Sequence, residues 1–304
     1  MRVVCFPFVP RYDNRVNQSL QGAKAAKVAV KVGDVKKKII AAIVAIAASF
    51  GLAACGSASA SSDHKYVVGV ASDQQKEIWE YVGKQVAKEG ITIDVKLFSG
   101  YTEENPALVD GSLDLNSFQH IAFLNNFNTE NKADLTYIGY TIISPFGLYS
   151  DKIKNYKDLK DGDTIAIPND VTNGGRALQL LDAIGVIKLK ADAPDSPTTK
   201  DIEKYIKKVK IEQLQADQIA PALQDVTAAT INTNYVTDQL HTTPEKSAIY
   251  IDTDHISKVS SIYKNVIAVR KEDKNKADFK KIVKAYQTDA VAKMIKETND
   301  IPAW

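Results

Sequence analysis

Residues 163–181, DTIAIPNDVTNGGRALQLL, place a short apolar stretch directly before a polar, glycine-containing loop. The stretch 163–167 predicts a β-strand. Asn173-Gly-Gly-Arg176 then opens a predicted helix that extends to about Ala183 and stops at Gly185. Strand, loop and helix in this order form the basic unit of an α/β fold. A loop at the carboxyl end of a strand is also where open α/β sheets bind ligands.

The same alternation of strands and helices continues on both sides of this unit. The predicted strands are 66–71, 91–98, 113–118, 208–213, 228–232 and 265–269, and the predicted helices are 74–89, 105–109, 121–127, 216–224 and 276–297. Residues 190–203 and 239–262 are predicted to be loops. The β-rich segment 135–149 is interrupted by Pro145, so we expect the chain to pass there from one lobe to another.

These patterns predict an α/β protein of two lobes with mostly parallel sheets. We expect the first lobe to contain residues 65–145 plus 270–304 and the second lobe to contain residues 146–269. No internal repeat is visible. The length of about 250 residues after Cys55 is sufficient for two modest lobes.

An export signal is predicted ahead of the folded part. Lys36, Lys37 and Lys38 precede the uncharged apolar stretch 39–54, which is short for a bilayer-spanning helix of roughly 20 residues. Leu52-Ala53-Ala54-Cys55 resembles the cleavage signal of bacterial lipoproteins. We therefore predict a lipoprotein signal peptide at 35–54 and a flexible linker at 55–64 that begins with acylated Cys55. The alternative is an uncleaved anchor helix with an incidental cysteine.

Residues 1–34 form a long mixed segment ahead of the basic start of the predicted signal peptide. Such a start normally lies near the true N-terminus. Our hypothesis is that translation begins at Val35 and that residues 1–34 are an overextended gene prediction. The alternative is a signal peptide with an unusually long N-terminal region.

The charge of the chain argues against nucleic-acid binding. The net charge is +2, but residues 1–54 contain nine Lys or Arg and only two acids, which leaves 30 basic and 35 acidic residues after them. This excess of acidic residues does not indicate the basic surface that nucleic-acid-binding proteins use. Cys55 is the only cysteine after residue 54, so the exported part has neither a disulfide nor a cysteine metal site. Catalytic motifs such as HExxH or GxSxG are absent, and we expect no enzyme activity, cofactor or metal.

Four loops that follow predicted strands contain the candidate ligand-binding residues. They include Tyr101, Phe118, His120, Phe123, Asn173, Arg176, Asn232 and Asn234. A guanidinium near a helix start suits a carboxylate, and the asparagine amides can hold an ammonium or a carboxylate. Aromatic walls suit a thioether, because contacts between sulfur and rings are favourable. Carboxylate, amine and thioether together describe methionine.

Each candidate also has a structural explanation. An arginine in the first turn of a helix is often on the surface, and Phe118 and Phe123 are more often core residues. His120 could be a hydrogen-bonded structural histidine. Asn232 and Asn234 could cap a turn.

The motifs resemble those of the NlpA-type substrate-binding lipoproteins of methionine ABC transporters. The resemblance extends over residues 66–304 and is strongest in GSLDLNSFQHIAFLNNFN (111–128), LKDGDTIAIPNDVTNGGRALQLL (159–181) and ATINTNYV (229–236). It implies a two-lobed clamshell of the type II periplasmic-binding-protein kind, with hinge motion on capture. It also implies a monomer that docks onto a membrane permease powered by an ATPase.

The resemblance implies roles for the candidate residues. Tyr101, Phe118 and His120 would form the side-chain wall, Arg176 would hold the carboxylate, and Asn232 and Asn234 would lie near the amino-acid head group. Two features depart from the family pattern: Phe123 stands where a tyrosine is usual, and Ala71-Ser72-Asp73-Gln74 replaces a turn rich in glycine and proline.

We therefore expect an exported protein, lipid-anchored at the outer face of the cell membrane, that captures L-methionine and is not an enzyme. D-methionine, the sulfoxide or a short peptide are alternative ligands, as is another small amino acid or organic anion. A surface adhesin that only retains the fold is the alternative from another class, and an intact set of Arg, Asn and aromatic residues argues against it.

Overall fold

The computed structural model describes residues 64–252 and 261–304. The predicted signal peptide, Cys55, the linker up to residue 63 and the segment 1–34 lie outside the described residues. Within the described part, no helix is both long and apolar enough to cross a membrane.

Two five-stranded sheets organise the chain, with strand orders β2-β1-β3-β13-β4 and β10-β7-β11-β6-β12. The first contains β1 (His64–Val70), β2 (Ile91–Leu97), β3 (Leu115–Asn116), β4 (Thr136–Tyr140) and β13 (Val266–Val269). The second contains β6 (Phe146–Tyr149), β7 (Thr164–Pro168), β10 (Lys210–Leu214), β11 (Ala228–Asn232) and β12 (Tyr250–Ile251). Two short ribbons pair β5 (Ile142–Ile143) with β14 (Ile301–Pro302) and β8 (Ile187–Leu189) with β9 (Ile202–Tyr205).

One strand in each large sheet runs against the other four. β13 is antiparallel to both β3 and β4, and β6 is antiparallel to both β11 and β12. All other pairings in these two sheets are parallel. The predicted α/β fold with two mostly parallel sheets is therefore confirmed. We call the part built on the first sheet the first lobe and the part built on the second sheet the second lobe.

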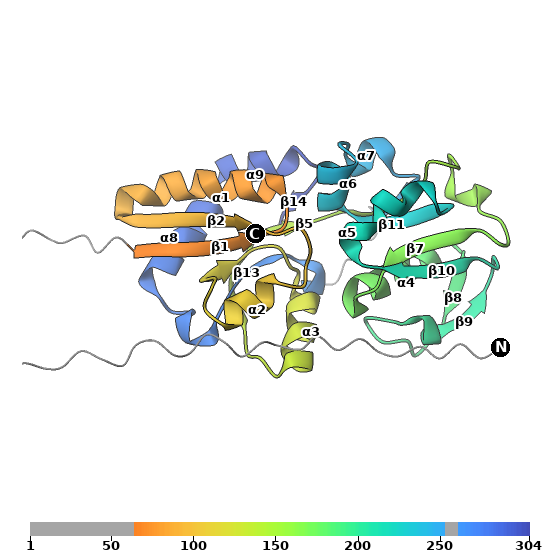
Figure 1. The fold of residues 1–304 in the computed structure, drawn as a ribbon, viewed down its shortest axis with the longest axis horizontal. Helices are drawn as coiled ribbons and strands as arrows, with labels where there is room; N and C mark the ends of the chain where they lie inside the picture. The colour runs from red at the N-terminus through yellow and green to blue at the C-terminus, as the bar shows by residue number, and fades with distance from the viewer. Residues whose placement is uncertain (1–63, 253–260) are drawn as a thin grey trace, which may run out of the picture. The chain divides into compact units, whose positions relative to one another are not determined.

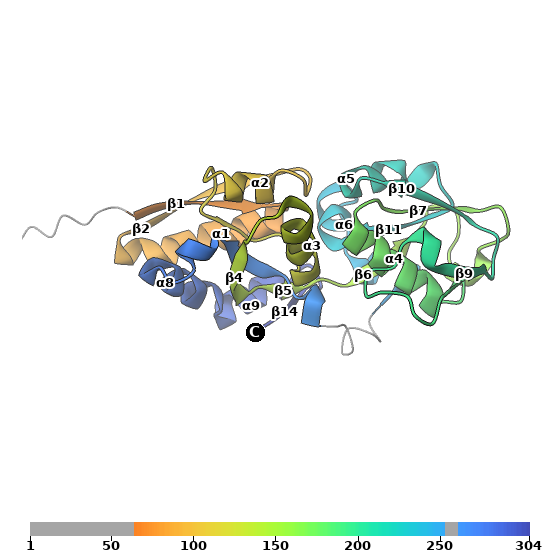
Figure 2. The same cartoon turned by 90° about the horizontal axis from the view of Figure 1, so that it is seen from below.

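Helices cover both faces of each sheet (Figure 1). In the first lobe they are α1 (Asp73–Val86), α2 (Glu104–Val109), α3 (Ile121–Asn131), α8 (Ala277–Tyr286) and α9 (Asp289–Lys296). In the second lobe they are α4 (Val171–Ala183), α5 (Ala216–Ile219), α6 (Thr233–Gln239) and α7 (Pro244–Ser247). Figure 2 shows α2 on one side of the first-lobe strands and α1, α8 and α9 on the other.

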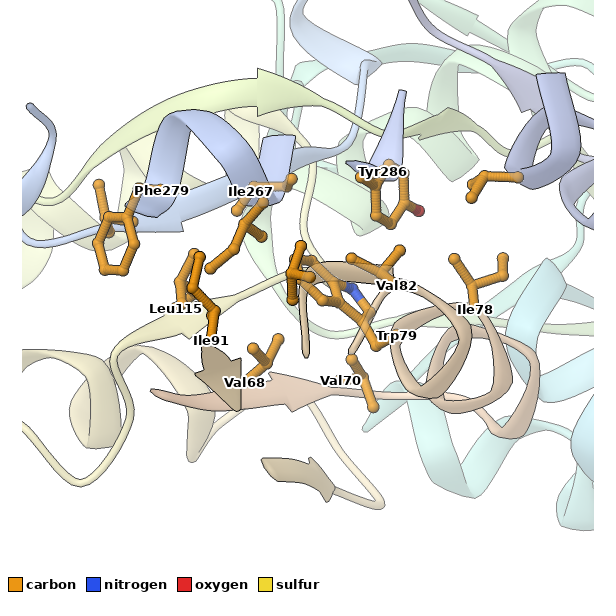
Figure 3. Close-up of a cluster of buried hydrophobic side chains, with 14 of the residues drawn as sticks. Val68, Val70, Ile78, Trp79, Val82, Ile91, Leu115, Ile267, Phe279 and Tyr286 are labelled. Atoms are coloured by element: carbon orange, nitrogen blue, oxygen red, sulfur yellow. The ribbon is translucent and has the colours of Figure 1, made fainter. Parts of the chain in front are cut away.

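The core of the first lobe follows from the apolar face of α1. Ser72 caps this helix by accepting a hydrogen bond from the Gln75 amide. The buried Trp79 ring packs 5.2 Å from the Tyr286 ring, between centroids, so α1 and α8 meet over the sheet (Figure 3). On β13, Ile267 and Val269 belong to this cluster, whereas Val266 and Ala268 face the cluster under α2 and α3. This period of two is what a strand buried on both faces produces.

The second sheet is sandwiched in the same manner. On β7, Ile165 and Ile167 pack with Leu178 of α4, while Ala166 between them packs with Ile219 of α5. Both faces of β7 are thus buried, and its carboxyl end leads into the loop that begins α4. The core therefore fixes the place where the predicted ligand loop emerges.

The predicted boundary of the second lobe at residue 269 is wrong. β13 (Val266–Val269) lies in the first sheet between β3 and β4, and its neighbour Asn265 lies opposite His120 in an isolated antiparallel bridge. The chain has thus returned to the first lobe before residue 265. An apolar run of four residues fits the core of either sheet, so its pattern could not decide which one.

Three other local predictions differ from the structure. The helix predicted at 276–297 is two helices: α8 ends at Tyr286 with Gln287 as its C-cap, and Thr288 caps α9 by accepting from the Val291 amide. Within the predicted loop 190–203, residue 202 already begins β9, which pairs with β8. Within the predicted loop 239–262, residues 244–247 form α7 and residues 250–251 form β12, which pairs with β6. The β-rich segment 135–149 is interrupted at Pro145, as predicted: it contains β4, β5 and β6, and Ser144-Pro145 connects the last two.

Candidate functional site

A cavity lies where the carboxyl ends of strands from both sheets meet. It encloses about 650 Å³ counting its opening to solvent, of which about 40 Å³ admits the centre of a water molecule. All eight candidate residues line it: Tyr101, Phe118, His120, Phe123, Asn173, Arg176, Asn232 and Asn234. The structure thus brings together residues that are up to 133 positions apart in the chain, as in the Tyr101–Asn234 hydrogen bond.

Arg176 is buried and contacts two aromatic rings. Arg176 is 5% exposed. Its guanidinium carbon lies 4.8 Å from the centroid of the Phe146 ring and 5.0 Å from the centroid of the Tyr263 ring. Nη2 donates to the Ser144 carbonyl at 2.9 Å, while Nε has no hydrogen-bond partner among the described residues. Burial lowers the pKa of Arg176 to about 10, so the group remains charged at neutral pH. A buried cation with a free donor suits a carboxylate.

The start of α4 explains how Arg176 reaches the cavity. Asp170 is the N-cap, and its Oδ1 accepts from the Asn173 amide at 2.9 Å. A Cβ on Gly174 would lie 2.7 Å from the Pro168 carbonyl oxygen, and one on Gly175 would lie 2.8 Å from the Ser196 Cα. Only glycine allows this close approach, so the two glycines let the first turn pack tightly and point the next residue inward.

Asn173 connects several polar side chains of the cavity wall. Its Nδ2 donates to both oxygens of Asp170, at 3.2 and 3.1 Å. Its Oδ1 accepts from Asn232 Nδ2 at 2.9 Å and contacts His120 Nε2 at 3.4 Å. Because both ends of the amide are occupied, Asn173 orients its neighbours and has little capacity left for a ligand.

His120 has a structural role in addition to lining the cavity. It is the N-cap of α3, and its Nδ1 accepts from the Phe123 amide at 3.1 Å. Nδ1 is therefore unprotonated, and Nε2–H is the donor toward Asn173. Burial, and next the charge of Arg176, lower the pKa of His120 to about 3. The ring is neutral at physiological pH.

The two candidate asparagines of the second lobe differ in what they offer. Asn232 is the residue before α6, yet its side chain does not cap that helix. Its Oδ1 is buried without a partner among the described residues, so this oxygen can accept a hydrogen bond from a ligand. Asn234 is occupied on both sides: Tyr101 donates to its Oδ1 at 2.5 Å, and its Nδ2 donates to the Ala71 carbonyl at 3.0 Å.

An aromatic wall faces these polar groups. The Tyr101 ring lies 5.8 Å from Phe118, 6.1 Å from Phe123 and 5.3 Å from Tyr235, between ring centroids. Phe118 and Phe123 are 5.9 Å apart in an edge-to-face arrangement. Such a wall presents polarisable faces to an apolar or thioether side chain.

Several residues that line the cavity were not predicted from the sequence, including Ser144, Phe146, Tyr263, Asn265 and Asp300. Ser144 and Phe146 belong to the crossing between β5 and β6, and Asn265 precedes β13. Pro145 marked the first crossing in the sequence, so its neighbours were candidates by position. Tyr263 and Asp300 had no such signal, because neither follows a predicted strand.

Comparison with known proteins identifies the family. The family model for the NlpA lipoproteins matches residues 66–304. The D-methionine-binding lipoprotein MetQ of Salmonella typhi is 38% identical over 260 residues, covering 84% of this chain and 93% of its own.

Two solved structures are similar along most of their length. A nutrient-binding protein from Burkholderia cenocepacia, solved bound to methionine, is 41% identical with a TM-score of 0.73, over 79% of this chain and 100% of that one. The substrate-binding protein of a methionine transporter from Streptococcus pneumoniae is 35% identical with a TM-score of 0.72, over 79% and 96%. These matches confirm the resemblance seen in the sequence and the two-lobed fold. The chain belongs to the NlpA lipoprotein family.

Proposed function

We propose that this chain is the substrate-binding lipoprotein of an ABC importer and that it captures methionine in the cavity between its lobes. The observation that supports this most strongly is Arg176, a buried cation whose Nε has no hydrogen-bond partner in the part of the chain that the structure describes, in a cavity that aromatic rings also line. Relatives named or solved as methionine-binding proteins support the same ligand.

The cavity walls fit the three parts of methionine separately. Arg176 would bind the carboxylate through charge-assisted hydrogen bonds. The free Oδ1 of Asn232 would accept from the ammonium group. The thioether would lie among Tyr101, Phe118 and Phe123, where sulfur and ring faces attract each other.

We propose capture without chemistry. A general base is most effective when its pKa lies near the working pH. His120 lines the cavity, but its pKa is lowered to about 3 and its Nδ1 is engaged by the Phe123 amide. Among the described residues, no cluster of acids, histidines or cysteines could hold a metal ion.

Delivery would occur at a membrane. We propose that Cys55 bears the lipid anchor at the outer face of the cell membrane. The folded part, as a monomer on a flexible linker at 55–64, would then reach a permease driven by an ATPase. This part of the proposal rests on the lipoprotein signal in the sequence and on the family.

Calorimetry on the full chain, purified in detergent and unfolded and refolded to remove carried-over ligand, tests the proposal. We expect saturable binding of L-methionine or D-methionine with one site per chain and no binding of glutamine. A protein that melts cooperatively but binds neither methionine isomer would contradict it.

A further inference from the structure

Two ionisable groups of opposite charge line the cavity, and among the described residues neither has an ion-pair partner. One is Arg176; the other is Asp300, which lies between α9 and β14 and is 6% exposed. Asp300 is the only acidic residue among the described residues that line the cavity. An ionised carboxylate is costly to bury unless a donor or a cation meets it.

The hydrogen bonding of Asp300 is incomplete. Thr298 Oγ1 donates to its Oδ2 at 3.2 Å. Its Oδ1 is buried and has no hydrogen-bond partner among the described residues. The unpartnered oxygen therefore belongs to a buried carboxyl that lines the ligand cavity.

Ser144 connects Asp300 with Arg176. β14 pairs with β5 so that Ile301 lies opposite Ile143, which sets the preceding residue Asp300 beside Ser144. The Ser144 side chain is close enough to Asp300 to lower its pKa, and the Ser144 carbonyl accepts from Arg176 at 2.9 Å. One residue of the wall is thus flanked by a cation and an acid, an arrangement that complements a zwitterion.

We propose that the Asp300 carboxylate binds the cationic amino group of the ligand, so that the cavity selects amino acids with a free ammonium group. This inference rests on the proposed function, because it assigns the ammonium of the captured amino acid to a charged partner in addition to the neutral Asn232 oxygen. Analogues that lack the amino group, or bear it acylated, would leave Asp300 unpaired.

The surroundings of Asp300 give the proposal a pH signature. Burial raises the pKa of Asp300 to about 7. Among the charged and titratable groups of the neighbouring elements, the charge of Asp300 acts on Tyr286 of α8. Arg176, His120 and Tyr263 line the same cavity. Lys264 donates to the carbonyl of Ala303, and Glu245 accepts from Asn299, so these two groups contact residues that flank Asp300 in the chain. Since a cationic ligand favours the ionised carboxyl, binding near pH 7 should release a proton, and affinity should fall as the pH drops below 7.

The test compares the native chain with Asp300→Asn and with Glu104→Gln as a matched control. Glu104 is also a buried acid without a partner among the described residues, but it does not line the cavity. Calorimetry would use the full chain in detergent, L-methionine and 4-(methylthio)butanoate, which lacks the amino group, between pH 6 and pH 8.5. Buffers of different ionisation enthalpy would report the protons released.

We expect the native chain to bind L-methionine more weakly at low pH, by up to about tenfold per unit below the pKa of Asp300. Asp300→Asn should lose about tenfold or more in affinity for L-methionine at pH 8, lose the pH slope and keep its affinity for 4-(methylthio)butanoate. Glu104→Gln should retain the native affinity and slope.

Three results would overturn the proposal in distinguishable ways. Native affinity and slope in Asp300→Asn would refute the role of Asp300 and leave methionine capture intact. If Asp300→Asn fails to fold, the native chain alone provides the test. The role of Asp300 would then be refuted if the native chain bound L-methionine and 4-(methylthio)butanoate with equal affinity, or if methionine binding released no proton near pH 7. A folded native chain that binds no free amino acid would refute both this proposal and the proposed function.

Discussion

Arg176 is the residue on which the proposed ligand contact depends most. It is held by Phe146, Tyr263 and the Ser144 carbonyl, so its guanidinium is positioned before a ligand arrives. Removing one partner of a buried charged hydrogen bond costs about 2 kcal/mol or more, which is about 30-fold in affinity.

We therefore predict that Arg176→Ala weakens methionine binding by at least about 30-fold, measured by calorimetry. Arg176→Lys should retain charge but lose the planar stacking between the two rings, and should bind with intermediate affinity. Thermal melting of each variant checks the fold. Unchanged affinity in a folded Arg176→Ala variant would remove Arg176 from the site.

Glu104 gives a prediction about stability rather than binding. It is 0% exposed, neither carboxylate oxygen has a hydrogen-bond partner among the described residues, and burial raises its pKa to about 8. At a pH between the pKa of Glu104 in the unfolded chain and its higher pKa in the folded chain, the folded state therefore binds more protons. Stability is lost as the pH rises from about 4.5 through 8.

Glu104→Gln mimics the protonated acid and should remove this loss. We predict that it raises the free energy of unfolding at pH 7 by on the order of 3 kcal/mol, with little change at pH 5. Urea unfolding at several pH values measures the difference. The same pH slope in native chain and variant would show that Glu104 is not buried as an unpaired acid.

The start of α4 combines close packing against neighbouring backbone with the ligand loop. Its second glycine lies against the backbone of Ser196 and Pro197, where a Cβ would come within 2.8 Å. This backbone cannot move as a flexible side chain does, so the helix start would have to shift.

We predict that Gly175→Ala destabilises the protein by about 1–3 kcal/mol and weakens methionine binding, because it displaces the adjacent Arg176. Gly83→Ala in α1 is the matched control: its Cβ would meet Ile93 Cβ at an ordinary 3.4 Å. The control should be neutral or stabilising by about 0.5–1 kcal/mol, as for alanine in a helix interior. Equal effects of the two substitutions on unfolding and binding would contradict the role of the close contact.

The elements that the sequence predicted best have caps and one clear apolar period. α1 has Ser72 at its start and a buried stripe that includes Trp79, and the helix predicted at 74–89 matches it closely. The C-terminal helix pair was predicted as one helix, since the apolar period continues through Gln287 and Thr288. Only the packing of two separate helices on the first lobe shows the break.

At the scale of the whole molecule, hydrogen bonds between the lobes close the cavity. Tyr101 of the first lobe donates to Asn234 of the second, Asn234 donates to Ala71, and Tyr235 donates to Ser99 at 3.3 Å. We expect the two lobes to separate when a ligand enters or leaves, which would break these hydrogen bonds.

We predict that small-angle X-ray scattering of the refolded, ligand-free chain shows a larger radius of gyration than the methionine-saturated chain. Tyr101→Phe, which removes a bond between the lobes but keeps the ring, should widen this difference. Identical scattering curves under conditions where calorimetry shows full occupancy would contradict closure on capture.

The candidate residues that the sequence suggested follow strands within one lobe, and all of them line the cavity. Loops after β2, β3, β7 and β11 all reach the cavity. Tyr263 and Asp300 were not predictable from the sequence. Tyr263 lies just before β13 and Asp300 just before β14, and the positions of these strands depend on how the chain crosses between the lobes. The assignment of β13 to the first sheet had the same cause.

The most direct test of methionine capture is a crystal structure of the unlabelled chain soaked or grown with L-selenomethionine, with anomalous scattering to locate the selenium. Our account predicts one selenium peak among Tyr101, Phe118 and Phe123, with the ligand carboxylate on Arg176. A fully occupied ligand elsewhere, or one whose selenium lies at Arg176 and whose carboxylate lies among the rings, would contradict it.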